Sequence, residues 1–173
     1  RDLADTQTPQ GIVAVIQKEE VGLPDFSQGK FLFLEDVQDP GNVGTMIRTA
    51  DAAGFTGVIV SDKSADIYSL KTLRSMQGSH FHLPIYRMSL ASFVEEAKKS
   101  NLPILATTLS KESKDYRELS PLENFALVMG NEGQGISSVM AESADQLVHI
   151  GMKGRAESLN VAVAAGILMF YFS

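Results

Sequence analysis

Short apolar runs alternate with longer helix-like stretches from residue 30 to the end of the chain. The apolar runs are rich in β-branched and aromatic residues, which favours buried strands. We expect strands at 30–37, 57–60, 85–87, 103–107, 125–129 and 147–150. We expect helices between them at 43–53, 68–76, 90–99, 136–143 and 158–172. Continuous apolar strands that alternate with helices predict an α/β fold, with a parallel sheet covered by helices on both faces.

The last predicted helix, 158–172, carries no charge and is apolar nearly all the way round. Such a helix belongs inside a core or an interface, and it is shorter than the roughly 20 residues that span a bilayer. Ser158 is the expected N-cap. We therefore expect a buried helix whose positive end faces the polar loop 151–157, with a ligand site at that helix start.

The composition of the chain argues against several classes of partner and cofactor. The formal net charge of −6 argues against a whole-surface electrostatic grip on nucleic acid, although a local basic patch remains open. The absence of cysteine excludes disulfides and thiolate chemistry and suits a reducing compartment, so we expect a cytoplasmic protein. With three histidines, two of them at His80 and His82, no metal site is expected. No signal peptide or transmembrane run is visible, so no membrane partner is expected.

Three polar, glycine-bearing loops, 35–44, 130–135 and 151–157, each follow a predicted strand and lead into a helix. Ligands of parallel sheets bind beyond the carboxyl ends of the strands. In the first loop, Asn42 is the expected helix cap, Gly44 leaves room for an approaching group, and Arg48 lies one turn on along the same side. A capped helix with a surface arginine explains the same residues.

The other two loops also allow two interpretations. The glycines at 130, 133 and 135 let backbone groups approach a ligand closely, but a tight strand-to-helix turn explains them as well. At the third loop, Ser158 and Asn160 offer polar groups to a ligand, while Ile150 and Leu159 could flank a flat apolar ring. Capping alone would account for Ser158; Asn160 in an apolar helix needs hydrogen-bond partners.

Taken together, in this order and spacing, the three loops resemble the motifs of the SPOUT superfamily of RNA methyltransferases, in its SpoU–TrmH branch. The matching stretches are N-V-G-T-M-I-R-T-A-D-A-A-G, M-G-N-E-G-Q-G-I and I-G-M-K-G-R-A-E-S-L-N-V-A-V-A-A-G. The earlier T-P-Q-G-I-V-A-V resembles the junction after a small N-terminal RNA-binding domain. The polar residues 1–11 predict a linker, and the β-branched run 11–17 predicts a short strand. The resemblance implies that residues 1–27 follow such a domain and that 28–173 form the methyltransferase domain.

The resemblance implies a parallel α/β fold with a deep C-terminal trefoil knot and a homodimer whose interface forms the active site. The cofactor would be S-adenosyl-L-methionine, and the reaction would be methyl transfer to a ribose 2′-hydroxyl of tRNA or rRNA. By position, Arg48 would be catalytic, with Asn42 and Glu132 orienting it or the substrate. Gly130, Ile150 and Leu159 would hold the adenine and ribose, largely through backbone groups. The residues expected at the cofactor are Thr107, Gly130, Asn131, Ile150, Met152, Ser158, Leu159 and Asn160.

One position departs from the family pattern: Gly151 stands where proline is usual, which implies a less preorganised pocket wall. Together with the negative net charge of the chain, Gly151 motivates an alternative hypothesis, a catalytically silent RNA-binding subunit of the same fold. A third hypothesis is a nucleotide-binding protein that holds phosphate with residues 130–135. Basic residues that could help to select RNA are Lys71, Arg74, Lys111, Lys114 and Arg117.

Overall fold

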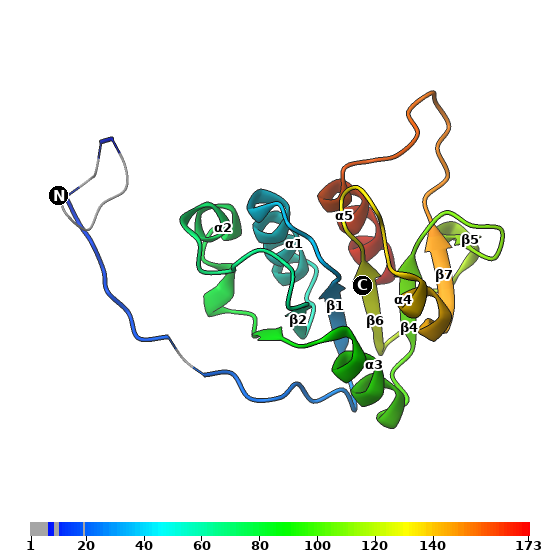
Figure 1. Ribbon diagram of the computed structural model, residues 1–173, viewed down its shortest axis with the longest axis horizontal. Helices are drawn as coiled ribbons and strands as arrows, with labels where there is room; N and C mark the ends of the chain where they lie inside the picture. The colour runs from blue at the N-terminus through cyan, green and yellow to red at the C-terminus, as the bar shows by residue number, and fades with distance from the viewer. Residues whose placement is uncertain (1–6, 9–10, 19) are drawn as a thin grey trace.

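A parallel β-sheet forms the centre of the protein in the computed structural model, which describes residues 7–8, 11–18 and 20–173. Its seven strands are ordered β3-β2-β1-β6-β4-β7-β5 (Figure 1). They are β1 (Lys30–Leu34), β2 (Gly57–Val60), β3 (Ile85–Arg87), β4 (Ile104–Thr107), β5 (Lys114–Asp115), β6 (Phe125–Met129) and β7 (Gln146–His149). All neighbouring pairs are parallel, so the predicted α/β class is confirmed.

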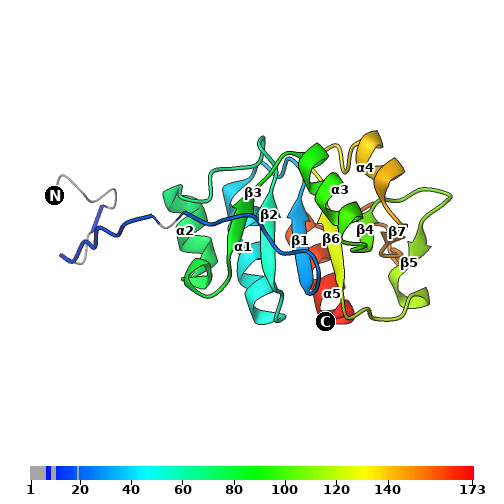
Figure 2. The same cartoon turned by 90° about the horizontal axis from the view of Figure 1, so that it is seen from below.

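Helices cover both faces of the sheet (Figure 2). One face carries α1 (Pro40–Ala52), α2 (Leu70–Met76) and α5 (Val161–Phe172), and the other carries α3 (Leu90–Lys99) and α4 (Ser138–Ser143). Two short 3-10 helices, η1 (Ser79–Phe81) and η2 (Tyr116–Glu118), lie in the connections. Leu32 and Leu34 of β1 point into the first core, while Phe31 and Phe33 point into the second. Because both faces are covered, β6 is apolar at every position and β1 is apolar after Lys30.

The strand expected at 11–17 is wrong: these residues are extended and pair with no strand in the described part of the chain. The segment leads away from the sheet in both views (Figures 1 and 2), and Ile12 and Val15 are 89% and 85% exposed. β-Branched residues form a strand only where a neighbouring strand supplies hydrogen bonds and a packing surface. The division of the chain at residue 28 stays a prediction.

The apolar helix is also only partly as expected. α5 begins at Val161, and its N-cap is Asn160, not Ser158. Ala165, Leu168 and Phe172 are buried, but one side of the helix is open: Val163 is 52% exposed and Phe170 is 55% exposed. An uncharged helix can face a core or an interface, and its composition does not distinguish the two. None of the described helices is long and apolar enough to cross a membrane.

The connection between β7 and α5 carries the chain back over the carboxyl edge of the sheet. Residues 150–160 leave the end of β7 as a wide loop and return to α5, which packs against α1 and β6 (Figure 1). Residues 151–160 are all exposed. The loop lines the same cavity as the ends of β4 and β6, so it stands next to these strands. The trefoil knot stays a prediction.

Candidate functional site

The carboxyl ends of three neighbouring strands open into one cavity of about 630 Å³. β4 contributes Thr107, β6 contributes Met129, β7 contributes His149, and α5 closes one side with Leu168. All the residues expected at the cofactor except Asn160 line this cavity: Thr107, Gly130, Asn131, Ile150, Met152, Ser158 and Leu159. The size lies within the roughly 300–1,000 Å³ of small-molecule sites, and the walls mix apolar and polar groups.

The loop after β6 forms a tight strand-to-helix turn, one of the two interpretations of its glycines. Asn131 and Gly135 exchange backbone hydrogen bonds of 3.0 and 2.9 Å, and Asn131 Oδ1 accepts from the amides of Gly133 and Gln134 at 2.9 and 3.0 Å. A Cβ at Gly130 would collide with the backbone of Gly135, so this close approach requires glycine. Because Asn131 uses the amides at 133 and 134, they do not form an open phosphate cradle.

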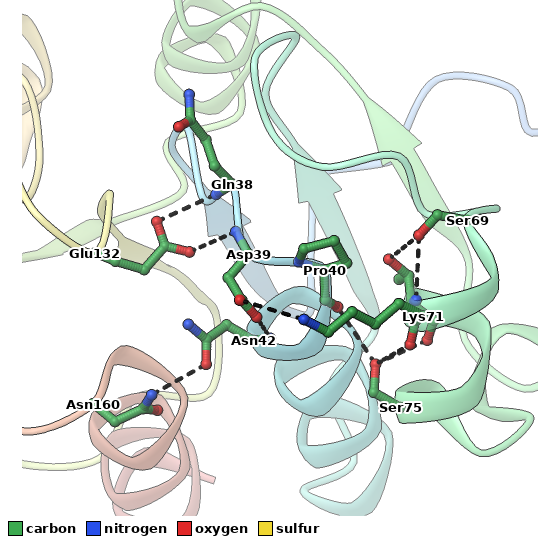
Figure 3. Close-up of polar contacts among 10 residues, drawn as sticks. Gln38, Asp39, Pro40, Asn42, Ser69, Lys71, Ser75, Glu132 and Asn160 are labelled. Carbon is green, nitrogen blue, oxygen red and sulfur yellow. Dashed lines mark hydrogen bonds and ion pairs between the residues drawn. The ribbon is translucent and has the colours of Figure 1, made fainter.

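Glu132 fastens this loop to the loop between β1 and α1. Its two carboxylate oxygens accept from the amides of Asp39 and Gln38 at 2.9 and 3.2 Å (Figure 3). Partial burial on its own would raise the pKa of Glu132, but hydrogen bonds from Asp39, Gln38 and Asn42 outweigh it and leave the pKa below its ordinary value. Glu132 therefore remains charged and holds the start of α1 beside the cavity.

A second carboxylate, which the sequence did not single out, joins the same two loops. Glu35 is 3% exposed and accepts hydrogen bonds from the backbone amide of Ser137 and from Ser137 Oγ, the latter at 3.0 Å. Burial raises the pKa of Glu35 even though both hydrogen bonds act to lower it. The one available signal was its place at the end of a buried strand. Its partner lies 102 residues away, which no local pattern reveals.

Asn42 and Asn160 link the first loop to the third. The N-cap of α1 is Asp39, whose Oδ1 accepts from the Asn42 amide at 2.9 Å, so the expectation that Asn42 caps this helix is wrong. Asn42 Oδ1 instead accepts from Asn160 Nδ2 at 3.2 Å (Figure 3). Asn160 Oδ1 caps α5 by accepting from Ala162 and Val163 at 2.8 and 3.2 Å. Asn160 thus lies outside the cavity and ties two helix starts together.

Gly44 and Arg48 do not share a ligand-facing side. A Cβ at Gly44 would lie 2.7 Å from the Thr72 carbonyl oxygen, so α2 occupies the room expected for an approaching group. Gly44 is buried and Arg48 is exposed. Arg48 does not line the cavity, and its side chain forms no hydrogen bond or ion pair with the other described residues. Its catalytic role stays a prediction.

Two of the basic residues considered for RNA selection are engaged in ion pairs. Lys71 lies 3.8 Å from Asp39, and Arg117 Nε lies 2.9 Å from Asp115 Oδ1. The other three, Arg74, Lys111 and Lys114, are exposed. Two further cavities of about 510 and 650 Å³ lie beside β3 and contain none of the predicted site residues. In the described residues, no group of three or more acidic or histidine side chains could hold a metal ion.

The fold and the cavity define the class: this is a SPOUT-type methyltransferase fold. The chain belongs to the SpoU rRNA Methylase family, whose profile matches residues 29–170. The resemblance inferred from the three motifs is therefore confirmed.

Relatives agree with this assignment. The chain is 46% identical over 169 residues to the 23S rRNA (guanosine(2553)-2′-O)-methyltransferase RlmP of Bacillus subtilis, covering 98% of this chain and 67% of that protein. It is 33% identical to the putative TrmH family tRNA/rRNA methyltransferase YacO of Bacillus subtilis, covering 93% and 68%. An AdoMet-bound rRNA methyltransferase from Sinorhizobium meliloti superposes with a TM-score of 0.78 at 40% identity, over 82% of this chain and 54% of that one. The chain thus spans about two thirds of these curated relatives and about half of that solved chain.

Proposed function

We propose that this chain is the catalytic domain of an S-adenosyl-L-methionine-dependent methyltransferase that modifies a ribose 2′-hydroxyl in ribosomal RNA. The observation that carries the proposal is the convergence of three separated loops on one cavity at the carboxyl ends of β4, β6 and β7. The RlmP relative supports ribosomal RNA over tRNA as the substrate, and a ribosomal substrate implies a cytoplasmic site of action.

The cavity suits a cofactor with a flat ring and a polar tail. Ile150 and Leu159 supply apolar surface, and Thr107, Asn131 and Ser158 supply polar groups. Thr107 Oγ1 already donates its hydrogen to the Val128 carbonyl at 2.9 Å, so its lone pairs are available to accept a hydrogen bond from a ligand. S-adenosylmethionine would bring a methyl group on a cationic sulfur, and a water-poor cavity favours a reaction in which that charge disappears.

Arg48 is the residue that we expect to act on the substrate. A guanidinium has a pKa above about 12, so it stays charged rather than serving as a base. In this role it grips a neighbouring RNA phosphate and stabilises the developing negative charge on the ribose oxygen. The hydroxyl proton leaves to phosphate or water. Asn42 and Glu132 hold the start of α1, the helix that carries Arg48 about two turns further on.

Since Arg48 lies outside the cavity lining of its own chain, we propose that it serves the cavity of a second copy in a homodimer. The open side of α5 is a suitable contact, because Val163, Ile167 and Phe170 are 52%, 37% and 55% exposed. α1 packs directly beside α5. A symmetric contact through these two helices would therefore bring Arg48 to the interface.

The test is methyl transfer to ribosomal RNA in vitro. The chain is incubated with S-adenosylmethionine carrying an isotopic methyl group and with unmodified ribosomal RNA, and the RNA is digested to nucleosides for mass spectrometry. A labelled 2′-O-methyl nucleoside is expected from the unaltered chain and from the control Lys99→Ala on α3, across the sheet from α1, but not from Arg48→Ala. A methyl label on a base instead of the ribose would contradict the proposal. RNA binding without methyl transfer, as a catalytically silent subunit would show, would also contradict it.

A further inference from the structure

An edge segment outside the cofactor cavity, Ser113 to Arg117, holds the end of β7 where it forms the cavity wall. β5 lies beside β7, with Asp115 opposite His149. Ser113 Oγ is 2.7 Å from His149 Nδ1, and the Gly151 amide donates to Asp115 Oδ2 at 3.2 Å. Ile150, which lines the cavity, therefore sits between two residues that are fastened to the same edge segment.

The carboxylate of Asp115, which accepts the hydrogen bond from Gly151, is itself held in place by Arg117. Its carboxylate accepts from the Arg117 amide at 3.0 Å, from Arg117 Nε at 2.9 Å and from Arg117 Nη2 at 3.1 Å. These bonds to Arg117 hold the pKa of Asp115 far below its usual range, so the carboxylate stays charged. The backbone around it is also fixed: the Tyr116 ring packs edge-on against Tyr171 of α5 at 4.9 Å, and Tyr171 Oη donates to the Leu119 carbonyl at 2.6 Å.

Gly151 fits this anchor for reasons of space and hydrogen bonding, not of backbone conformation. Its φ does not lie in the left-handed region. A Cβ at position 151 would lie 2.9 Å from Asp115 Oδ2, closer than such atoms can approach. Proline at this position would add that clash and would remove the N–H that donates to the carboxylate. The hydrogen bond to Asp115 therefore requires a residue at position 151 that has an N–H and no Cβ.

We propose that Asp115 is a positioning residue for the cofactor site, acting through the Gly151 amide to hold the wall formed by Ile150. The hydrogen bond replaces the restraint that a proline ring would place on the loop. Asp115 itself is not part of the cavity lining. This inference deepens the proposed function and rests on it, because it assumes that the cavity binds S-adenosylmethionine.

A double-substitution cycle tests the pairing. S-adenosylmethionine binding is measured by calorimetric titration, and its KM and the kcat are measured with ribosomal RNA. Asp115→Ala should raise Kd and KM for the cofactor by about five- to tenfold, which is in the range for loss of one typical hydrogen bond. The kcat at saturating cofactor should change little. Gly151→Pro should weaken binding in the unaltered background, yet it should restore binding when combined with Asp115→Ala, since the clash is gone and the ring stiffens the loop.

Glu118→Ala is the matched control, because it removes an exposed carboxylate next to the same segment but leaves Asp115, Arg117 and the Gly151 amide in place; its Kd should stay within about twofold. Amide hydrogen exchange on the unaltered chain gives a measurement that needs no variant, and the Gly151 amide should be protected despite its exposed loop. Three results would overturn this inference but not the proposed function. They are rapid exchange of the Gly151 amide, unchanged cofactor binding by Asp115→Ala, and equal weakening of binding by Gly151→Pro in both backgrounds. Failure of the unaltered chain to bind the cofactor would overturn the proposed function as well.

Discussion

Replacing Asn160 with alanine or with aspartate separates the stability of α5 from the geometry of the site. Asn160 Oδ1 accepts from two amides in the first turn of α5, and its Nδ2 donates to Asn42. Alanine removes all three hydrogen bonds. Aspartate keeps the two at the helix start but has no N–H to offer Asn42.

The expected size of the stability effect follows from the cap. Loss of an asparagine N-cap costs about 0.5–2 kcal/mol in the free energy of unfolding. For a domain of this length each kcal/mol lowers Tm by about 2–4 °C, so Asn160→Ala should lower Tm by roughly 1–8 °C. Asn160→Asp should keep Tm or raise it slightly, because a carboxylate at a helix N-terminus contributes about 0.3–1 kcal/mol.

Activity should follow the other hydrogen bond. Asn42 lies between Asn160 and Glu132, so an aspartate at 160 makes two carboxylates compete for one amide group. We expect both Asn160 variants to lose most methyl transfer, although only the alanine variant loses stability. Thermal unfolding and the transfer assay are run side by side. Ser158→Ala is the control in the unfolding experiment, where its Tm should stay unchanged because Ser158 does not cap α5. Full turnover by Asn160→Asp would refute the role of the Asn42 contact, and an unchanged Tm in Asn160→Ala would refute the cap.

Three further expectations concern catalysis, pH dependence and assembly. Arg48→Lys should lose most activity at unchanged Tm, since an ammonium does not reproduce the planar guanidinium fork; near-normal turnover would remove Arg48 from the mechanism. Burial raises the native pKa of Glu35 above its ordinary 4.5, so its contribution to stability is fully present below that pH and is lost as pH rises through the native pKa. The Tm of the unaltered chain should therefore fall relative to Glu35→Gln as the pH rises above about 4.5, and a pH-independent difference would contradict this sign. Phe170→Asp should weaken dimerisation by at least about tenfold in analytical ultracentrifugation, whereas Val139→Asp, at a similarly exposed valine of α4, should not; equal effects would exclude the α5 contact.

The sheet was predictable because its central strands are buried on both faces. Phe31 and Leu32 point into different cores, so β1 is apolar from Phe31 to Leu34 and stands out from its surroundings. β5 was missed because it consists of only Lys114 and Asp115, whose pairing depends on the nearby β7 and not on their own side chains. The segment 11–17 shows the converse: β-branched residues without a neighbouring strand form no strand.

Within the site, the convergence of the loops was predictable, but their hydrogen bonds were not. Loops that follow parallel strands meet at one edge of the sheet, so Gly130, Ile150 and Leu159 were expected together. Both helix caps were misassigned, because Asp39 and Asn42, like Ser158 and Asn160, are capping residues within one turn of each other and only the backbone path chooses between them.

Long-range contacts account for the two residues that sequence reasoning overlooked. Glu35 bonds to Ser137 over 102 positions, and Asp115 receives the Gly151 amide over 36 positions. Neither carboxylate belongs to a local motif. Each becomes meaningful only when the fold brings its partner alongside.

The central claim is that S-adenosylmethionine occupies the cavity between loops 130–135 and 150–159. Calorimetric titration of the unaltered chain, Leu159→Arg and Leu23→Arg tests it most directly, because both leucines are exposed and each lines a cavity, Leu159 at the proposed site and Leu23 beside β3. The account predicts one cofactor per chain, binding abolished by Leu159→Arg and unchanged by Leu23→Arg. No binding by the unaltered chain, or loss of binding only in Leu23→Arg, would contradict it.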